Sequence, residues 1–165
     1  MVSAAPFAVR PVALDDPQCL DLLTLHLAGM RQHSPAESVH ALDLTGLSGP
    51  ALTVLGAWSP DGRLAAIGAM KRLGEKRPGG GQAEVKSMRT HPDFLRKGAA
   101  AALLEAIIAL AREEGLRRLS LETGSGEAFE PALSLYRKRG FTNGEAFADY
   151  TATDFNQFLH LDLHS

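Results

Sequence analysis

Hydrophobic residues recur at two different spacings along this chain of 165 residues. In some segments every second residue is hydrophobic, which is typical of a strand with one buried face, and in others every third or fourth, which is typical of an amphipathic helix. Both spacings meet in the segment 83–114, where residues 84–90 alternate as a strand and Pro92 ends that strand. A glycine-containing loop and a long helix follow from Gly98 onward, with hydrophobic residues at helical spacing: Leu103, Leu104, Ile107, Ile108 and Ala111. The rest of the chain is organised around this strand, loop and helix.

The same two patterns divide the remaining chain into further elements separated by turn residues. Strands are predicted at residues 7–12, 51–58, 64–73, 118–122, 141–147 and 157–163, and helices at residues 17–30, 34–44 and 130–139. Asp16 is suited to cap the first helix, and Gly115 and Gly140 to end two others. A strand–helix–strand crossover around residues 98–115 implies one parallel pair of strands, whereas the tight turns imply antiparallel pairs. The element order therefore predicts an α+β fold with a mixed, mostly antiparallel sheet and helices on both faces.

Composition and charge limit the classes of function. With 45% hydrophobic and 22% charged residues, the chain is expected to form a single domain over residues 1–165. The net charge of −2 argues against nucleic acid and acidic membranes as partners. The start is unlike a signal peptide and no apolar run is long enough for a bilayer, so we expect a cytoplasmic protein with no membrane partner. The one cysteine, Cys19, excludes an internal disulfide and is expected to be a small packed side chain.

The start of the long helix has features of a phosphate-binding site. Its first backbone N–H groups have no partner within the helix, and the two cations Arg96 and Lys97 precede the small residues Gly98, Ala99 and Ala100. Small residues let a ligand come close to the backbone. The patterns GxxxxGK[ST] and GxGxxG are absent, which disfavours a nucleotide phosphate-binding protein. Seen by itself, the segment is more typical of an ordinary helix start with two solvated cations.

Two motifs together change that balance. Residues 95–100 read LRKGAA and follow Thr90-His91-Pro92, while residues 132–141 fit the pattern A-x-x-L-Y-x-x-x-G-F with Tyr136 at its centre. The two motifs resemble the acyl-CoA loop and the tyrosine segment of the GCN5-related N-acetyltransferases (GNAT), and the resemblance covers nearly the whole chain. Leu95 stands where that family usually has Gln or Arg, and Phe129 stands where it often has Asn.

The resemblance implies a GNAT-type central sheet of about seven strands flanked by about four helices, with acetyl-CoA as the cofactor. It implies that Tyr136 protonates the departing thiolate, and that a bulge in the strand 84–90 exposes a backbone N–H to the acyl carbonyl. Without the first motif, Tyr136 would be interpreted as a buried aromatic residue of its helix. The residues expected to bind the cofactor are Met88, Arg89, Thr90, Leu95, Arg96, Lys97, Gly98, Ala99, Ala100, Thr123, Phe129 and Tyr136.

The catalytic base and the acceptor site are less well defined by the sequence. A base must remove a proton from the acceptor ammonium, and the resemblance suggests Glu84, although an exposed carboxylate at a strand end is an equally good interpretation. His33 and His40 are rival bases. The resemblance also implies that His33, Ser38 and His40 border the acceptor site, the alternative being a polar surface turn. No metal site is predicted, because the six histidines are scattered without the spacing of known ligand sets.

The resemblance implies an acetyl-CoA-dependent N-acetyltransferase that moves an acetyl group directly, in a ternary complex, to the amine of a small molecule or amino-acid-like acceptor. The alternative is a non-catalytic acyl-CoA-binding sensor of the same fold. Tyr136 favours the enzyme, whereas Leu95 and Phe129 keep the sensor open. The expected partner is the small-molecule amine, and a homodimer is compatible with the sequence.

Overall fold

The computed structural model describes residues 7–33, 51–73, 81–148 and 150–163, and within these ranges the chain forms seven strands and three α-helices. The strands are β1 (Ala8–Pro11), β2 (Leu52–Trp58), β3 (Leu64–Leu73), β4 (Gln82–Thr90), β5 (Arg118–Thr123), β6 (Thr142–Gly144) and β7 (Gln157–Asp162). The helices are α1 (Pro17–His33), α2 (Ala99–Glu113) and α3 (Glu130–Lys138), and the short 3-10 turns η2 (Pro92–Phe94) and η3 (Glu127–Phe129) precede α2 and α3. None of these helices has the length and hydrophobicity needed to cross a bilayer.

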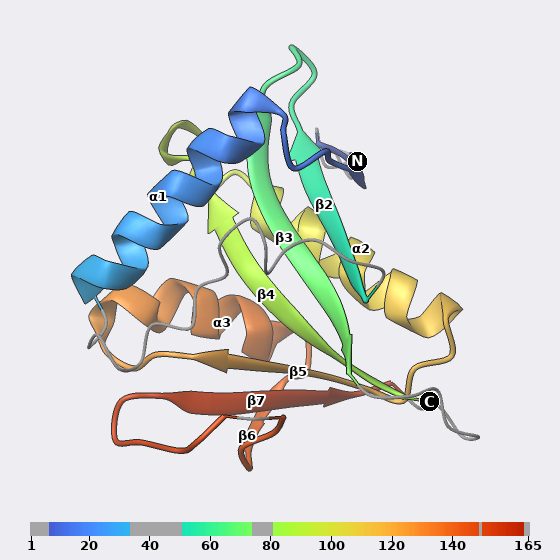
Figure 1. Ribbon diagram of the computed structural model, residues 1–165, viewed down its shortest axis with the longest axis vertical. Coiled ribbons are helices and arrows are strands. Elements are labelled where there is room, and N and C mark those ends of the chain that lie inside the picture. The colour runs from blue at the N-terminus through green and yellow to red at the C-terminus, as the bar shows by residue number, and fades with distance from the viewer. Residues whose placement is uncertain (1–6, 34–50, 74–80, 149, 164–165) are drawn as a thin grey trace.

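All of the strands belong to one sheet, in the order β1-β2-β3-β4-β5-β7-β6 (Figure 1). Neighbouring strands run antiparallel except β4 and β5, which run parallel because α2 connects them as a crossover. The mixed, mostly antiparallel sheet that the element order predicted is therefore confirmed.

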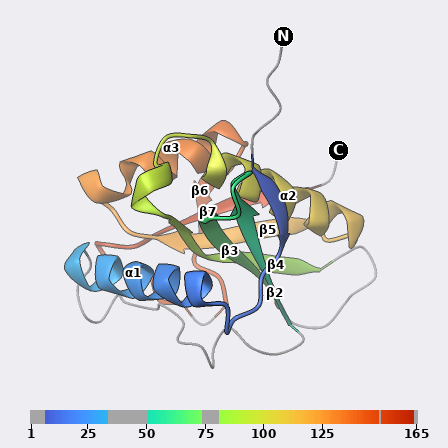
Figure 2. The same ribbon diagram turned by 90° about the horizontal axis from the view of Figure 1, so that it is seen from above.

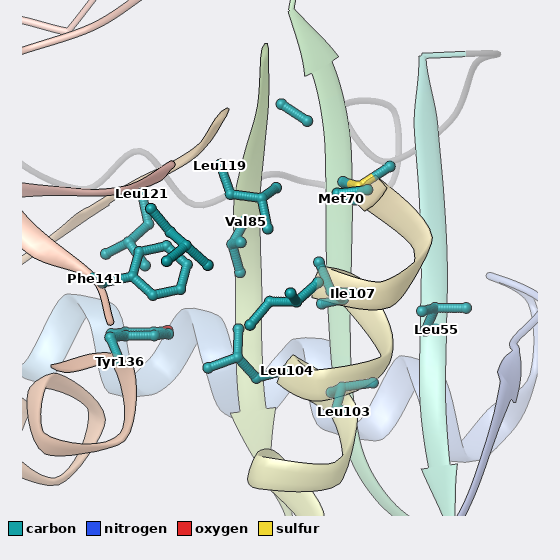
Figure 3. Packing of buried hydrophobic residues seen from close by; sticks show 14 of the residues in the cluster. Leu55, Met70, Val85, Leu103, Leu104, Ile107, Leu119, Leu121, Tyr136 and Phe141 are labelled. Carbon is teal, nitrogen blue, oxygen red and sulfur yellow. The ribbon is translucent and has the colours of Figure 1, made fainter. Parts of the chain in front are cut away.

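Helices cover both faces of this sheet (Figure 2). On one face, which we call the α1 face, helix α1 packs its buried Cys19, Leu22 and Leu23 against β3 and its neighbours. On the opposite face, the α2 face, helices α2 and α3 cover the larger hydrophobic cluster (Figure 3). A leucine or isoleucine that becomes fully buried contributes about 1.5–3 kcal/mol. The two clusters therefore fix the face of the sheet on which each strand residue lies.

Most predicted element bounds differ from the observed ones by a few residues only. Asp16 caps α1 as predicted, since its Oδ1 accepts hydrogen bonds from the backbone N of Gln18 at 2.8 Å and of Cys19 at 3.4 Å. Gly140 follows α3 with a positive φ of 98°, as a helix-ending glycine does. The helix predicted at residues 34–44 lies outside the described residues, which contain the other three.

The strand predicted at residues 141–147 is wrong in length, because only Thr142–Gly144 pair with β7. Phe141 is buried in the cluster of the α2 face and is not part of the ladder. Phe147 is buried as well, and its ring packs edge-on against Phe158 of β7 with centroids 5.9 Å apart. Hydrophobic residues at both ends of the segment gave the appearance of a longer strand, although each is buried by packing outside β6.

Candidate active site

The sheet opens between β4 and β5. These two strands pair only through residues 82–84 and 118–120, whereas β4 continues to Thr90 and β5 to Thr123. Beyond Glu84 the strands diverge (Figure 1), and the edge of β4 that faces β5 has no strand partner among the described residues. Backbone groups on that edge are available to a ligand.

A bulge in β4 lies beside this opening. The pairing register of β3 with β4 shifts at Gly68, which faces the two residues Ser87 and Met88. Ser87 has a positive φ of 57°, an uncommon conformation for a residue with a side chain. The sulfur of Met88 occupies the space that a side chain at Gly68 would need. The bulge that the resemblance implied for this strand is therefore present, and glycine is the residue that accommodates it.

The bulge decides which β4 side chains share a face. Val85 and Met88 pack into the hydrophobic cluster of the α2 face. Lys86 and Arg89 lie opposite β3 residues that pack against α1, and so they face α1 although they are three residues apart. Glu84, two residues before Lys86, shares their face. The opening is thus bordered by apolar side chains on the α2 face and by charged side chains on the α1 face.

The N-terminus of α2 follows the loop after β4. Gly98 caps this helix with a φ of 90°, and no described residue beyond its chain neighbours has an atom within 4 Å of the position that a Cβ would take. The first hydrogen bond of the helix runs from the backbone N of Ala102 to the O of Gly98 at 2.9 Å, and in the described part of the chain nothing accepts from the backbone N–H groups of residues 99–101. Arg96 and Lys97 are exposed just before the helix. Free N–H groups, open space and two cations suit a phosphate group.

Three other predicted cofactor contacts differ in what they can offer. Leu95 is 56% exposed in the loop before α2. Phe129, in η3, packs edge-on against Phe155 with ring centroids 5.5 Å apart, and it has no polar atom. Thr123 ends β5 opposite Gln157 and is half-buried. Of the three, only Thr123 has a side chain that can form a hydrogen bond.

Tyr136 extends from α3 into the cluster of the α2 face and is only 6% exposed. Its ring packs edge-on against Phe141 at 5.8 Å, and its hydroxyl end is directed toward Leu104 of α2 (Figure 3). No described residue forms a hydrogen bond with that hydroxyl. Burial raises the pKa of Tyr136 to about 12, so the phenol keeps its proton at neutral pH. A protonated hydroxyl without an internal partner can donate to a ligand.

A cluster of polar side chains, which we call the polar cluster, lies on the α1 face at the opening and consists of Glu84, Lys86, Glu122 and Tyr150. The Tyr150 hydroxyl donates a hydrogen bond to Glu84 Oε2 at 2.5 Å, and Lys86 Nζ donates one to the Tyr150 hydroxyl at 3.1 Å. Lys86 Nζ also lies 3.6 Å from Glu84 Oε2. Burial, followed by the charges of Glu84 and Glu122, raises the pKa of Tyr150, so this phenol remains a proton donor.

The interpretation of Glu84 as an exposed carboxylate is wrong, because the residue is only 3% exposed. Its carboxylate is held by Tyr150 and Lys86 at the last point where β4 and β5 pair. Glu122 adds a second carboxylate from β5, which accepts a hydrogen bond from Asn156 Nδ2 at 3.1 Å. Two fixed carboxylates can attract an ammonium group, and a carboxylate can accept its proton.

Sequence reasoning missed three members of the polar cluster. Lys86 follows Glu84 by two residues and therefore shares its face in a strand, so the alternation could have revealed it. Glu122 is recognised only once β4 and β5 are known to be neighbours. Tyr150 carried no local signal, because it lies in the irregular segment between β6 and β7 and meets Glu84 across 66 residues of sequence.

The side chains predicted to line the acceptor site lie outside what the structure describes, so none of them is placed beside the polar cluster. His33 is the last residue of α1, and its side chain is outside what the structure describes. Ser38 and His40 also lie outside the described residues. As acceptor contacts or rival bases these three residues remain predictions. Among described residues, no group of three His, Cys, Asp or Glu side chains is arranged to hold a metal ion.

Known proteins resemble this chain in both sequence and fold. Residues 19–141 match the model of the Acetyltransferase (GNAT) family. The chain is 41% identical over 157 residues to the Escherichia coli (strain K12) protein named uncharacterized N-acetyltransferase YedL, and the alignment covers 95% of each chain. It is 47% identical over 133 residues to uncharacterized N-acetyltransferase YsnE of Bacillus subtilis (strain 168), covering 81% of this chain and 84% of that one. The crystal structure of the "putative acyl-CoA N-acyltransferase" of Klebsiella pneumoniae subsp. pneumoniae MGH 78578 matches with a TM-score of 0.80 at 26% identity, covering 98% of this chain and 100% of that one.

Proposed function

The chain belongs to the GNAT acetyltransferase family, and from this premise we propose that it transfers the acetyl group of acetyl-CoA to the amine of a small molecule. The observation that carries the proposal is the opening between β4 and β5, with a protonated phenol on one face and a buried carboxylate on the other. Direct transfer requires that a thioester and an amine meet in one geometry. Divergent strands let the two substrates approach from opposite faces of the sheet.

On the α2 face, the chain's own residues suit acetyl-CoA, which supplies an acetyl group activated as a thioester. The backbone N–H groups of residues 99–101, together with Arg96 and Lys97, would bind its pyrophosphate. The open space at Gly98 supports this fit, since a phosphate can come close to the backbone. The unpaired edge of β4 at residues 88–90 would orient the thioester and polarise its carbonyl through a backbone N–H.

The reaction forms a C–N bond to the acetyl carbon and breaks its C–S bond. Glu84 is the proposed base, which accepts the proton of the acceptor ammonium, directly or through a water molecule, so that a neutral amine attacks the acetyl carbon. The second proton, which the nitrogen loses as the C–S bond breaks, passes to solvent. Tyr136 is the proposed acid, which donates its phenolic proton to the departing thiolate sulfur. Solvent then removes the proton from Glu84 and returns one to Tyr136, so the enzyme regains its starting state.

A non-catalytic acyl-CoA sensor is the second candidate. Leu95 and Phe129 are apolar at positions where the resemblance leads us to expect a polar residue, which favours weaker or altered cofactor contacts. The Tyr136 hydroxyl, to which no described residue is hydrogen-bonded, and the pre-formed polar cluster favour the enzyme, because a sensor has no use for either.

Thiol release from acetyl-CoA, followed with a chromogenic disulfide across a panel of amines, amino acids and short peptides, tests the proposal. Acetyl-CoA without acceptor provides the background of hydrolysis. We expect acceptor-dependent thiol release for at least one class of amine, with the acetylated product identified by mass spectrometry. Tight binding of CoA in calorimetry without any acceptor-dependent release would instead identify the sensor.

A further inference from the structure

Arg89 is a half-buried cation on the α1 face that the described carboxylates leave unneutralised. Its Nε donates a hydrogen bond to Nδ1 of His26 at 3.3 Å, and its Nη2 donates one to the backbone O of His26 at 3.4 Å. Within the ranges that the structure describes, no Asp or Glu forms an ion pair with it, and burial lowers the pKa of the guanidinium without an opposing acidic charge. Several of its N–H groups therefore remain for a ligand.

His26 holds Arg89 without cancelling its charge. The imidazole, on α1, is 8% exposed. Burial, and then the charge of Arg89, lowers the pKa of His26 to about 4, so the ring is neutral at physiological pH. A neutral ring can accept at Nδ1, which agrees with the hydrogen bond from Arg89 Nε. The contact thus fixes the direction of the guanidinium and leaves its full positive charge in place.

The polar cluster lies on the same face of β4. The β3 partners of Lys86 and Arg89 are two residues apart and face α1 together, so about 7 Å of strand separates Arg89 from Lys86. Lys86 is already engaged by Tyr150 and lies near Glu84. Among the described residues, the α1 face of β4 therefore has an acidic end at Glu84 and Glu122 and a cationic end at Arg89 that no described carboxylate neutralises.

We propose that Arg89 binds a carboxylate of the acceptor, so that the acceptor is an amino acid or another small amine that also bears a carboxylate. The inference rests on the proposed acetyl transfer and names the chemical class of its second substrate. The acidic end of the face attracts the amine and the cationic end binds the carboxylate, which orients a zwitterion along β4. A guanidinium matches a planar carboxylate with two parallel hydrogen bonds, and neighbouring carboxylates disfavour a doubly charged phosphate.

A contact of Arg89 with the phosphates of CoA is the competing explanation. The α2 N-terminus belongs to the helix layer of the α2 face, whereas the Arg89 side chain contacts α1 on the opposite face. The backbone of Arg89 can still border the thioester, because only the side chain is assigned to the acceptor. Affinity for CoA in an Arg89 variant therefore separates the two explanations.

Acceptors that differ only in the carboxylate provide the test. Kinetics with α-amino acids and ω-amino acids are compared with those of their carboxamides, for the wild type, Arg89→Gln and Arg89→Lys. We expect the wild type to favour the carboxylate in kcat/KM, and Arg89→Gln to lose about tenfold to a hundredfold of that preference through KM. Arg89→Lys should recover part of it, and CoA affinity should stay unchanged. Arg118→Gln, which removes another half-buried arginine at the paired end of β5, is the control and should leave the preference intact.

Binding of products provides a readout that does not require turnover. Calorimetry with N-acetyl amino acids and N-acetyl amino acid amides, in the presence of CoA, should show tighter binding of the carboxylates to the wild type and no such difference in Arg89→Gln. Equal use of carboxylates and carboxamides by an active wild type overturns the inference and leaves the proposed transfer intact. Absence of turnover with every amine contradicts the proposed transfer, while discrimination in the product titration still supports a carboxylate site at Arg89.

His26 is a positioning residue in this account, and its substitution separates positioning from simple packing. His26→Asn keeps an acceptor where Nδ1 lies, so we expect KM for the acceptor to stay within about twofold of the wild type. His26→Leu removes the acceptor and should raise KM severalfold with little change in kcat. Equal KM values in the two variants would show that the hydrogen bond to Arg89 does not position the guanidinium.

Discussion

The two faces of the sheet meet at the opening between β4 and β5, but they are built in different ways. On the α2 face, the candidate groups are the backbone at Gly98 and residues 99–101 together with one phenol, Tyr136, in apolar surroundings. On the α1 face, they are charged and polar side chains from α1, β4, β5 and the segment between β6 and β7. A site made mainly of backbone groups suits an acetyl donor that is the same in every reaction of this kind. Side chains that are distant in the sequence and adjacent only in the folded chain suit an acetyl acceptor that varies from one protein to the next.

The two faces also differ in how their polar groups are satisfied. Tyr136 and the first N–H groups of α2 have no internal partner in the described part of the chain, whereas Glu84, Lys86 and Tyr150 bond to one another. Removing a group of the first kind should affect the ligand and leave the fold unchanged. Removing one of the second kind leaves a buried partner unsatisfied, which costs about 1–3 kcal/mol. This contrast sets the expected effects of substitution.

Tyr136→Phe should have the largest effect on catalysis, a fall in kcat of about 10²–10⁴-fold, because one proton donor is removed and ring packing is kept. Affinity for acetyl-CoA and the melting temperature should be unchanged. Tyr150→Phe, which removes the same atom on the other face, is the matched control and should lower the free energy of unfolding because Glu84 loses a hydrogen bond. Full activity in Tyr136→Phe would mean that water protonates the thiolate.

Gly98→Glu should weaken CoA binding by about a thousandfold, since a like charge about 4 Å away at the protein surface costs about 4 kcal/mol. Calorimetry with CoA measures the effect. Gly62→Glu is the matched control, because Gly62 has a φ of 87°, close to the 90° of Gly98, and also has no atom within 4 Å of a Cβ. Both variants have the same backbone strain, so equal losses of CoA affinity would show that Gly98 does not border the pyrophosphate.

Glu84→Gln should lower kcat/KM by about a hundredfold at neutral pH if the carboxylate is the base. The deficit should shrink as the pH rises, because a larger share of the amine is then already neutral. A pH–rate profile of both enzymes measures this. Glu105→Gln, which removes a surface carboxylate paired with Arg139, should behave as the wild type. A deficit that is the same at every pH would leave Glu84 with a structural role only.

His26 should make the stability of the α1 face depend on pH. Its folded pKa, about 4, lies below the ordinary value of 6.5, so the unfolded chain binds the proton first as the pH falls. The contribution to stability is complete above pH 6.5 and is lost between pH 6.5 and 4, by about 3 kcal/mol. Urea denaturation at pH 7.5 and 4.5 should show this loss of unfolding free energy in the wild type. His26→Asn has no titrating ring at this position, so its loss over the same pH interval should be smaller by the contribution of His26.

The difference between the faces also explains what could be predicted from the sequence. Gly98 and Tyr136 stand in short motifs that depend on local geometry, so the groups that we propose for the α2 face, and their order along the chain, could be named from the sequence. On the α1 face, Glu84 was named as a base and Arg89 only as a cofactor contact. Tyr150, the partner of Glu84, was missed because it is 66 residues away in a segment without periodic signal.

Arg89 shows a second reason for the limit of sequence reasoning. Strict alternation from Glu84 places residue 89 on the opposite face of the strand. The bulge at Ser87 adds one residue, so Arg89 faces α1 together with Lys86. The resemblance implied a bulge in this strand, but the alternation of the residues does not give its position, which is set by the pairing with β3 opposite Gly68.

A crossed titration tests the division between the two faces most directly. Calorimetry would first measure the affinities of Gly98→Glu and Arg89→Gln for CoA. It would then measure, with CoA present, the affinities of Arg89→Gln and the wild type for the N-acetyl amino acid that binds the wild type best. We expect Gly98→Glu to lose CoA affinity by about a thousandfold. Arg89→Gln should retain its affinity for CoA and lose about tenfold to a hundredfold of its affinity for the N-acetyl amino acid. Loss of CoA affinity in Arg89→Gln, or its retention in Gly98→Glu, would contradict the assignment of donor and acceptor to opposite faces of the sheet.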